Sequence, residues 1–296
     1  MTDGIINVNK PAGWTSQDVC SKLRHVLNTK KIGHTGTLDP MATGVLPVCV
    51  GKATRIIEYY DKDTKSYHAS MKLGITTDTL DITGKILETA GYSKVSENGV
   101  REAFKAYTGH VMQMPPKYSA LKIDGRRAYD LAREGKTFEI SPREIIIYDN
   151  SVTKIDLANG EIEFDVTCSK GTYIRTICDD IGRELGCGAA MTALTRTASG
   201  YFGIEDSYTI EEIIEAEDPM KTMLIPADIT LEKLGKIELN NNRITAFMNG
   251  NSSWSNGFRV TEQSSFDRLY RVYGNGSFLG IGEVENGSLV PKKVIK

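Results

Sequence analysis

Several features that mark other protein classes are missing from this chain of 296 residues. No stretch approaches the ~20 consecutive apolar residues that cross a membrane. The first residues, Met1–Ile5, lack the basic region and apolar run of a secretion signal. We therefore expect a cytoplasmic protein without a membrane association. The hydrophobic fraction of 40% is ordinary for a globular domain.

Cofactor and metal motifs are also missing. The five cysteines contain no Cys-x-x-Cys pair and the four histidines are scattered, so a zinc site is not expected. The cysteines are predicted to be buried, reduced thiols. No Gly-x-Gly-x-x-Gly sequence or phosphate-binding loop is present, so no nucleotide cofactor is indicated.

The net charge of −2 excludes a protein that is basic all over, but the charges are unevenly distributed. Residues 10–65 contain nine Lys/Arg against five Asp/Glu, whereas residues 205–238 contain ten Asp/Glu against three Lys. A basic face opposite an acidic one is typical of a protein that binds a polyanion on one side. The alternative is that these are ordinary solvated charges.

The segment Gly33–Pro40 is the most distinctive local sequence. Its two glycines permit backbone angles that other residues avoid, and its proline pushes Asp39 out of the helical region. The apolar run 41–50 that follows predicts a buried strand. A carboxylate on such a constrained loop is well placed to be a nucleophile or a base. The alternative is an aspartate that only caps its own turn.

Hydrophobic periodicity gives a coarse map of the chain. Alternation predicts strands at 5–9, 66–73 and 161–168 and near Tyr201. Helical spacing predicts helices at 16–27 (capped by Ser16), 100–107, 128–134 and 174–185, and Thr209 with Glu212 predicts a capping box. Residues 112–143 form a basic, irregular excursion that can reach a ligand. Residues 1–230 are expected to form the main domain, and the Gly/Asn/Ser turns after it predict a small β domain at 231–296.

Four segments, taken in order, carry a resemblance to a known family: Lys10–Ser16, the Asp39 loop, Tyr67 with Leu73–Gly74, and Lys170–Arg175. Together they resemble the TruB family of tRNA pseudouridine synthases, which isomerise the uridine at tRNA position 55 in the T loop. The resemblance covers the first ~230 residues. The stretch Tyr118–Lys122 through Gly135 is similar to the family's RNA-gripping insertion, and the tail resembles a PUA domain.

The resemblance implies an α+β pseudouridine-synthase fold with a mixed, mostly antiparallel sheet, flanking helices and a small PUA-like RNA-binding β domain. It implies a tRNA substrate bound through its T arm, base flipping, no cofactor and no metal. No protein partner is implied, and a monomer is expected. Asp39 takes the place of the catalytic aspartate, Tyr67 of the aromatic that stacks on the flipped base, and Leu194 of a pocket-lining residue. Tyr173 and Arg175 match the motif whose arginine pairs with the catalytic carboxylate, and His34 matches the histidine that holds the opened loop.

The chemistry explains why such residues are needed. A carboxylate in a dry pocket must stay ionised although burial raises its pKa, and a guanidinium opposes that shift. The sequence leaves open whether Asp39 acts as nucleophile or as base. Arg175 could instead form a surface ion pair, and Tyr67 could be a core tyrosine. Phosphate contacts are expected from the cations Lys22, Arg24, Lys30, Lys31, Arg126 and Arg127.

Three rival functions remain at this point. The first is an RNA-guided pseudouridine synthase that acts in an assembly, although this chain has only Lys292, Lys293 and Lys296 as a basic tail. The second is a non-catalytic RNA-binding protein. The third is a glycoside hydrolase, which would need a second carboxylate ~5–10 Å from the first, and no motif supplies one.

Overall fold

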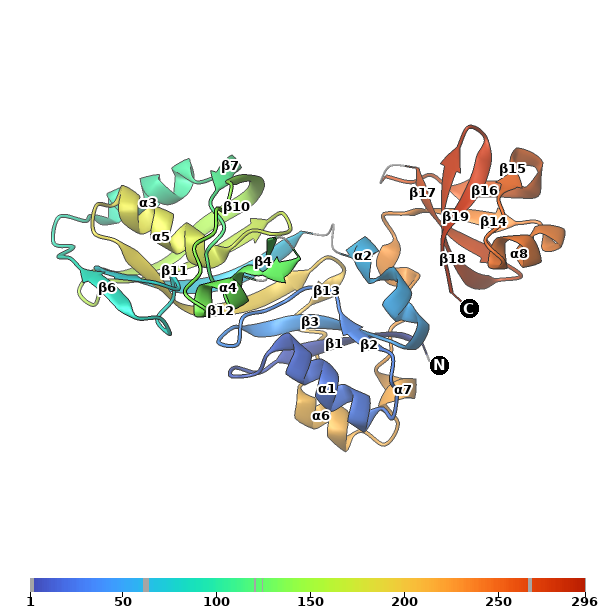
Figure 1. The fold of residues 1–296 in the computed structure, drawn as a ribbon, viewed down its shortest axis with the longest axis horizontal. Helices are drawn as coiled ribbons and strands as arrows, with labels where there is room; N and C mark the ends of the chain where they lie inside the picture. Colours follow the sequence, from blue (N-terminus) through green and yellow to red (C-terminus); the bar gives the residue numbers. More distant parts are fainter. Residues whose placement is uncertain (1–2, 61–63, 120, 124, 266–267, 296) are drawn as a thin grey trace.

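A computed structural model describes residues 3–60, 64–119, 121–123, 125–265 and 268–295. Lys62 and Ala120, which belong to the predicted basic region and the predicted insertion, lie outside these ranges. Figure 1 shows two lobes, a large one built on residues up to about 225 and a smaller one built on the C-terminal residues. A short helical connection lies between them.

The large lobe is organised around a nine-stranded sheet with the strand order β1-β3-β12-β4-β11-β10-β7, to which β2 and β13 add at β3 and β12. Its pairs are antiparallel except for β12 with β3, so the sheet is mixed and mostly antiparallel as predicted. The strands are β1 (Gly4–Lys10), β2 (Ile32–His34), β3 (Thr43–Val50), β4 (Lys65–Leu73), β7 (Gly109–Gln113), β10 (Arg143–Asp156), β11 (Glu161–Cys168), β12 (Ala189–Ser199) and β13 (Phe202–Gly203).

Helices cover this sheet because each has one apolar stripe. In α5 (Ile174–Glu184) the residues Ile177, Cys178 and Ile181 are buried against the sheet. Beside it lies α3 (Glu97–Ala106), whose Phe104 ring lies 4.8 Å from the ring of Phe164 on β11. The helices α1 (Ser16–Val26), α6 (Ile210–Glu215) and α7 (Pro219–Thr222) lie at the β1 end (Figure 1).

Two short hairpins extend from the large lobe. One consists of β5 (Ile75–Thr77) and β6 (Ile86–Thr89). The other lies within the predicted insertion and consists of β8 (Lys122–Ile123) and β9 (Arg126–Arg127), followed by α4 (Ala128–Arg133). Because β7 ends at Gln113 and β10 begins at Arg143, the insertion leaves and re-enters the sheet on neighbouring strands.

The small lobe contains a six-stranded sheet with the order β15-β19-β18-β17-β14-β16 and the helix α8 (Asn241–Met248). Its strands are β14 (Gly235–Leu239), β15 (Ser253–Trp254), β16 (Phe258–Glu262), β17 (Leu269–Gly274), β18 (Ser277–Glu285) and β19 (Ser288–Val294). The short helices η1 (Gly51–Ile56), α2 (Ile57–Tyr60), η2 (Ile229–Leu231) and η3 (Ser255–Gly257) complete the fold. Apolar residues of η1 and β3 form one buried cluster with Leu231, Leu234 and Ile281, which joins the two lobes.

Most predicted elements are confirmed, and two details are wrong. Thr15, not Ser16, caps α1, and its hydroxyl accepts from the Asp18 backbone in a capping box. The predicted strand near Tyr201 is only the two-residue β13, because the main strand here is β12, at residues that alternate weakly. The predicted β structure of the tail is confirmed, and the tail also contains the helix α8. The five cysteines are free and buried, and the Thr209–Glu212 capping box is present.

Candidate active site

A cavity of about 230 Å³ opens where four segments meet: the Asp39 loop, β4, β12 and the start of α5. Ser119 of the insertion closes a further side. Five of the six predicted site residues line this cavity. They are Asp39, Tyr67, Tyr173, Arg175 and Leu194.

The Asp39 loop is held from below by groups far from it in sequence. Ser16 Oγ accepts a hydrogen bond from the Leu38 backbone at 2.9 Å, and Leu38 is buried. The Nζ of Lys10 donates to the carbonyls of Pro11, Trp14 and Pro40 at 2.9, 2.7 and 3.3 Å. Lys10 is fully buried, which lowers its pKa to about 8, with the charge of Asp39 opposing that shift. A loop without regular structure thus acquires a fixed conformation.

Asp39 pairs with Arg175 rather than with its own turn. The Nε of Arg175 lies 3.0 Å from Oδ2 of Asp39. The Arg175 side chain is only 6% exposed, whereas the Asp39 carboxylate is 37% exposed toward the cavity. A guanidinium buried to this degree is not a surface ion pair. The geometry therefore favours an oriented carboxylate that is accessible to a ligand.

The rest of the Arg175 guanidinium is also occupied. Nη1 donates to the Thr79 carbonyl at 3.0 Å and lies 3.5 Å from Oδ2 of Asp81. Nη2 donates to the Tyr118 carbonyl at 3.0 Å. Asp81 is buried, and its other oxygen accepts from Thr79 and Thr83. Arg175 is therefore fixed between two carboxylates, one buried and one facing the cavity.

The pKa of Asp39 is raised above its ordinary value. Burial of the carboxyl is the main cause, and the charge of Asp81 adds to it. Arg175 is the strongest opposing influence and Lys10 is a weaker one. The guanidinium thus limits the shift without cancelling it. Loss of the guanidinium would push the carboxyl further toward its protonated form.

Tyr67 and Leu194 form an apolar side of the cavity. Tyr67 lies on β4 and is 7% exposed, and Leu194 lies on the neighbouring β12. Burial raises the pKa of the Tyr67 hydroxyl, so the phenol stays neutral near pH 7, and Arg196 opposes the shift. Arg196 is fully buried and donates to the carbonyls of Val45 and Gly36 at 2.6 and 3.3 Å.

Close packing of β12 on β3 places Arg196 under the Asp39 loop. Gly44 on β3 has φ of +97°, and a Cβ built there would lie 2.3 Å from the Arg196 carbonyl. Glycine is therefore required at this position.

Tyr173 and His34 lie at the edges of the site. Tyr173 is the residue before α5, and the guanidinium of Arg143 lies 5.1 Å from its ring centre. His34 does not line the same cavity. It lies in a neighbouring open hollow of about 670 Å³ with Arg55 and Lys293. Burial lowers the His34 pKa, and the cations Arg196 and Arg127 lower it further, so the ring is neutral near pH 7.

The cations predicted to contact phosphate have diverse surroundings. Lys22, Lys30 and Lys31 are exposed near the C-terminal end of α1 and the loop after it. Arg126 is paired with Glu134 within the insertion. Arg127 is exposed, lies above the Tyr129 ring at 5.9 Å, and is close enough to His34 to affect that residue's pKa. The insertion therefore lies over the same side of the molecule as the Asp39 loop.

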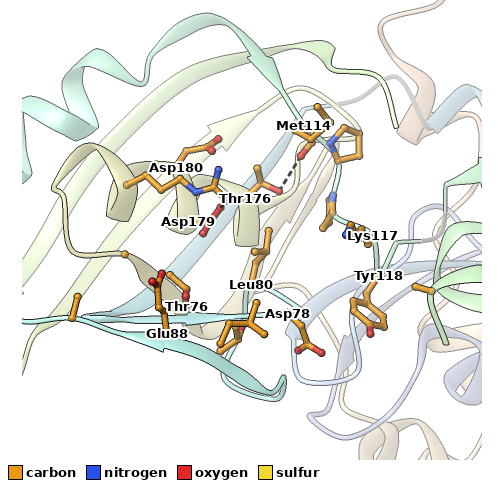
Figure 2. A pocket seen from close by; sticks show the side chains of 18 of the residues that line it. Thr76, Asp78, Leu80, Glu88, Met114, Lys117, Tyr118, Thr176, Asp179 and Asp180 are labelled. Atoms are coloured by element: carbon orange, nitrogen blue, oxygen red, sulfur yellow. Dashed lines mark hydrogen bonds and ion pairs between the residues drawn. The ribbon is translucent and has the colours of Figure 1, made fainter. Parts of the chain in front are cut away.

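A larger cavity of about 1160 Å³ lies on the other side of the start of α5, between this helix and the β5–β6 hairpin (Figure 2). It is lined by Leu80, Asp179 and Asp180, among others, and by none of the predicted site residues. Its buried carboxylate, Asp179, is already paired with Arg183 at 2.6 Å, and the cavity is lined by neither Asp39 nor Arg175. Size alone therefore does not identify the site of chemistry.

Sequence reasoning missed several polar residues at the site. They are Lys10, Lys65, Asp81, Ser119 and Arg196, all buried. Lys10 stood in a segment that carried the resemblance, so its position was a usable signal. The sequence around Asp81 is typical of a turn, and the Arg196 guanidinium donates to carbonyls that are distant in sequence. Neither residue therefore belongs to a local sequence pattern that indicates a site. The Ser119 hydroxyl has no hydrogen-bond partner within the described part of the chain.

Comparison with known proteins identifies the family. Residues 24–174 match the N-terminal domain of TruB family pseudouridylate synthases. Residues 175–232 match the C-terminal domain of tRNA pseudouridylate synthase B, and residues 235–295 match a second TruB C-terminal domain.

Within the described ranges, no helix is long and apolar enough to cross a membrane.

Curated relatives are similar over nearly the whole chain. The tRNA pseudouridine synthase B of Clostridium kluyveri is 43% identical over 281 residues, which is 95% of either chain. The protein of the same name from Clostridium perfringens strain 13 is 41% identical over 294 residues, or 99% of either chain.

Solved structures agree on the fold. A Cbf5–Nop10–Gar1 complex contains a chain with a TM-score of 0.76 and 26% identity, covering 99% of this chain and 85% of that one. An archaeal box H/ACA Nop10–Cbf5 complex gives a TM-score of 0.75 and 25% identity, covering 99% and 86%. With matching family models, relatives above 40% identity and this shared fold, the chain belongs to the TruB family of tRNA pseudouridine synthases.

Proposed function

We propose that this enzyme isomerises the uridine at position 55 in the T loop of tRNA, with Asp39 as the catalytic carboxylate. The observation that carries the proposal is the 3.0 Å pair between Arg175 and an Asp39 that faces the cavity. We further propose that residues 1–230 form the catalytic domain, with an RNA-gripping insertion at 112–143. Residues 231–296 would be a PUA-like domain that adds RNA contacts.

The isomerisation is balanced without any added group. The bond between ribose C1′ and uracil N1 breaks, a bond between C1′ and C5 forms, and the proton lost from C5 is matched by one gained at N1. No oxidation state changes, so the reaction needs no redox cofactor. Asp39 acts on the ribose or on the base, and either route needs the carboxylate ionised. The Arg175 guanidinium supports that ionised form, because it opposes the effect of burial on the Asp39 pKa.

The cavity suits one flipped base. Extruding a base from a folded loop costs a few kcal/mol, and stacking on an aromatic ring returns ~1–3 kcal/mol. Tyr67 would supply the ring, and Leu194 on the neighbouring strand would add an apolar contact beside it. The Ser119 hydroxyl, which has no hydrogen-bond partner among the described residues, is available to a polar atom of the uridine. We propose that His34, in the adjoining hollow, holds the space that the uridine leaves.

Affinity for RNA would come from cations on the insertion and around α1. Arg127, Lys22, Lys30 and Lys31 are exposed and free to meet phosphates, so binding should weaken as salt rises. Recognition would rest on the shape of the RNA and on splayed bases, as is usual for RNA loops. The T arm is the proposed contact region.

We propose that the enzyme acts alone, as a monomer and without a guide RNA. The structural neighbours come from complexes of Cbf5 with other proteins. The relatives above 40% identity, in contrast, are named tRNA pseudouridine synthase B. Conversion of bare tRNA by the purified protein would separate the two possibilities.

The test uses an unmodified T-arm hairpin and an otherwise identical hairpin with cytidine at the target position. We expect the purified enzyme to form pseudouridine at position 55 of the first hairpin, detected by chemical mapping. Asp39→Ala should abolish product while the hairpin still binds within about threefold, because the carboxylate is not a phosphate contact. Normal turnover by Asp39→Ala would refute the assignment.

A further inference from the structure

We propose that Gln113, the last residue of β7, is a positioning residue that fixes the start of α5 and thereby the place of Arg175 against Asp39. This inference rests on the proposed roles of Asp39 and Arg175. Gln113 belongs to no part of the site described above and does not line its cavity.

Gln113 makes a reciprocal pair of hydrogen bonds with a single residue of the α5 start. Its Nε2 donates to the Tyr173 carbonyl at 3.1 Å, and its Oε1 accepts from the Tyr173 backbone N–H at 2.8 Å. The residue is fully buried, so no water competes for these bonds. Of the side chains that could occupy this position, a neutral amide has both a donor and an acceptor at its end.

The helix needs such an external anchor. Tyr173 is the N-cap of α5, and its side chain makes no capping hydrogen bond. A helix start normally uses a Ser, Thr, Asp or Asn side chain for that purpose. The amide of Gln113 is on another strand and fixes the backbone of the cap residue instead. Arg175 is the second residue after this anchored position.

The segment after Gln113 makes further contacts with the first turn of α5. The Thr176 hydroxyl donates to the Met114 carbonyl at 3.4 Å, as the dashed line in Figure 2 shows. The Tyr118 carbonyl accepts from Nη2 of Arg175. Between these two contacts lie the buried Pro115 and Pro116, which restrict the backbone. The first turn of α5 is thus attached at three points to the segment that leads into the RNA-gripping insertion.

A shift of the α5 start would be felt at Asp39. The Arg175 guanidinium makes its contacts to Asp39, Asp81, Thr79 and Tyr118 in one geometry, so a displaced helix start cannot keep them all. The Asp39 side chain is more exposed than that of Asp81, 37% against 6%, so we expect the Asp39 contact to be lost first. Weaker contact with the guanidinium would let burial raise the pKa of Asp39 further. Activity would then be lost at a higher pH than in the unmodified enzyme.

The experiment compares Gln113→Leu with Asn150→Leu. Asn150 on β10 also uses a side-chain amide to hold a helix end, donating to the Phe104 and Tyr107 carbonyls at 3.1 and 3.3 Å, and neither of these partners belongs to α5 or is its cap residue. Single-turnover rates are measured on the T-arm hairpin at saturating enzyme between pH 5.5 and 9. For Gln113→Leu we expect a loss of about tenfold or more at pH 7 that shrinks toward pH 9, with hairpin affinity unchanged within about twofold. Asn150→Leu should keep the profile of the unmodified enzyme.

A second variant and a second readout keep the test decisive. Gln113→Glu retains the size and the acceptor but loses the donor when ionised, and it is used if Gln113→Leu does not fold. The Arg175 Nε–H signal in ¹⁵N NMR reports the pairing without any substrate, and we expect its exchange with water to speed up in the Gln113 variants alone. Failure of the unmodified enzyme on the hairpin would count against the proposed function. An unchanged Arg175 signal, or a rate loss equal at every pH, would overturn the role of Gln113.

Discussion

Buried charge is distributed unequally between the two sheets, and it serves different ends in each. The large lobe buries six Lys, Arg and Asp side chains among its described residues: Lys10, Lys65, Asp81, Arg175, Asp179 and Arg196. In the described part of the small lobe, Arg271 is the one counterpart. Its guanidinium donates to the Leu234 and Asp228 carbonyls at 2.9 and 3.3 Å and to Glu262 at 2.6 Å.

The surroundings of the buried charges distinguish the proposed reactive site from a purely structural contact. Burying a charge is costly unless it is paired and hydrogen-bonded. In the small lobe the cost is met by the carbonyls of the connecting segment, so Arg271 holds the sheet to its linker. In the large lobe Lys65, Arg175 and Arg196 line one cavity with Asp39, and the charges of Lys10 and Asp81 act on the pKa of that carboxyl. Such convergence is expected where a carboxylate must be kept ionised for chemistry.

The largest effect is expected at Asp81, which tests whether buried charge in the large lobe supports the reaction. In Asp81→Asn the amide still fits, but Arg175 loses its buried anion. We expect the rate at saturating RNA to fall about tenfold to hundredfold, less than for a group that contacts the reacting atoms.

The control is Asp165→Asn, which removes an exposed partner of His68 on the same sheet. Exposed pairs contribute ~0–1 kcal/mol, so this variant should keep the rate within about twofold. Equal rate losses in the two variants would mean that the Asp81 charge does not support the reaction through Arg175.

A smaller effect is expected for Tyr67→Leu, which tests the apolar side of the cavity. Stacking on a base is worth ~1–3 kcal/mol, and leucine keeps part of that contact, so the ratio kcat/KM on the hairpin should fall about fivefold to tenfold. Tyr148→Leu, an exposed tyrosine on β10, should leave kcat/KM unchanged. A Tyr67→Leu enzyme with full kcat/KM would show that Tyr67 is only a core residue.

The smallest effect on turnover is expected at Arg271, the buried cation of the small lobe. Arg271→Leu should lower the free energy of unfolding by about 2 kcal/mol, because buried carbonyls lose their donor, as measured by urea denaturation. Turnover on the T-arm hairpin at 25 °C should stay within about twofold. A rate loss as large as that of Asp81→Asn would erase the distinction between the two lobes.

Hydrophobic spacing predicted most of the strands and helices, because it reflects which face of each element is buried. The burial alternation of β4 and β11 and the apolar stripe of α5 could be read from spacing alone. The strand β12 was misplaced because its residues, among them Thr195 and Arg196, alternate weakly, and its burial depends on strands distant in sequence. Ser16 and Thr15 are both good cap residues by type. Tertiary contacts decide between them, since the Ser16 hydroxyl accepts from the Leu38 backbone and Thr15 caps the helix.

The site was predictable only as far as its motifs reached. Asp39, Tyr67, Arg175 and Leu194 were placed through the family resemblance, and the structure brings them into one cavity. Asp81 and Gln113 could not be found in this way. Their partners lie 94 and 60 residues away along the chain, so no spacing rule connects them.

The central claim is that Arg175 keeps Asp39 ionised, and the most direct test is the pH dependence of the single-turnover rate in Arg175→Lys. Lysine keeps a positive charge but cannot reproduce the planar set of donors that contacts Asp39, Asp81, Thr79 and Tyr118. Because the Asp39 pKa is already raised by burial, we predict that the acidic limb of the rate profile moves to higher pH and that part of the lost rate returns by pH 9. A lower rate with an unmoved acidic limb would contradict the account.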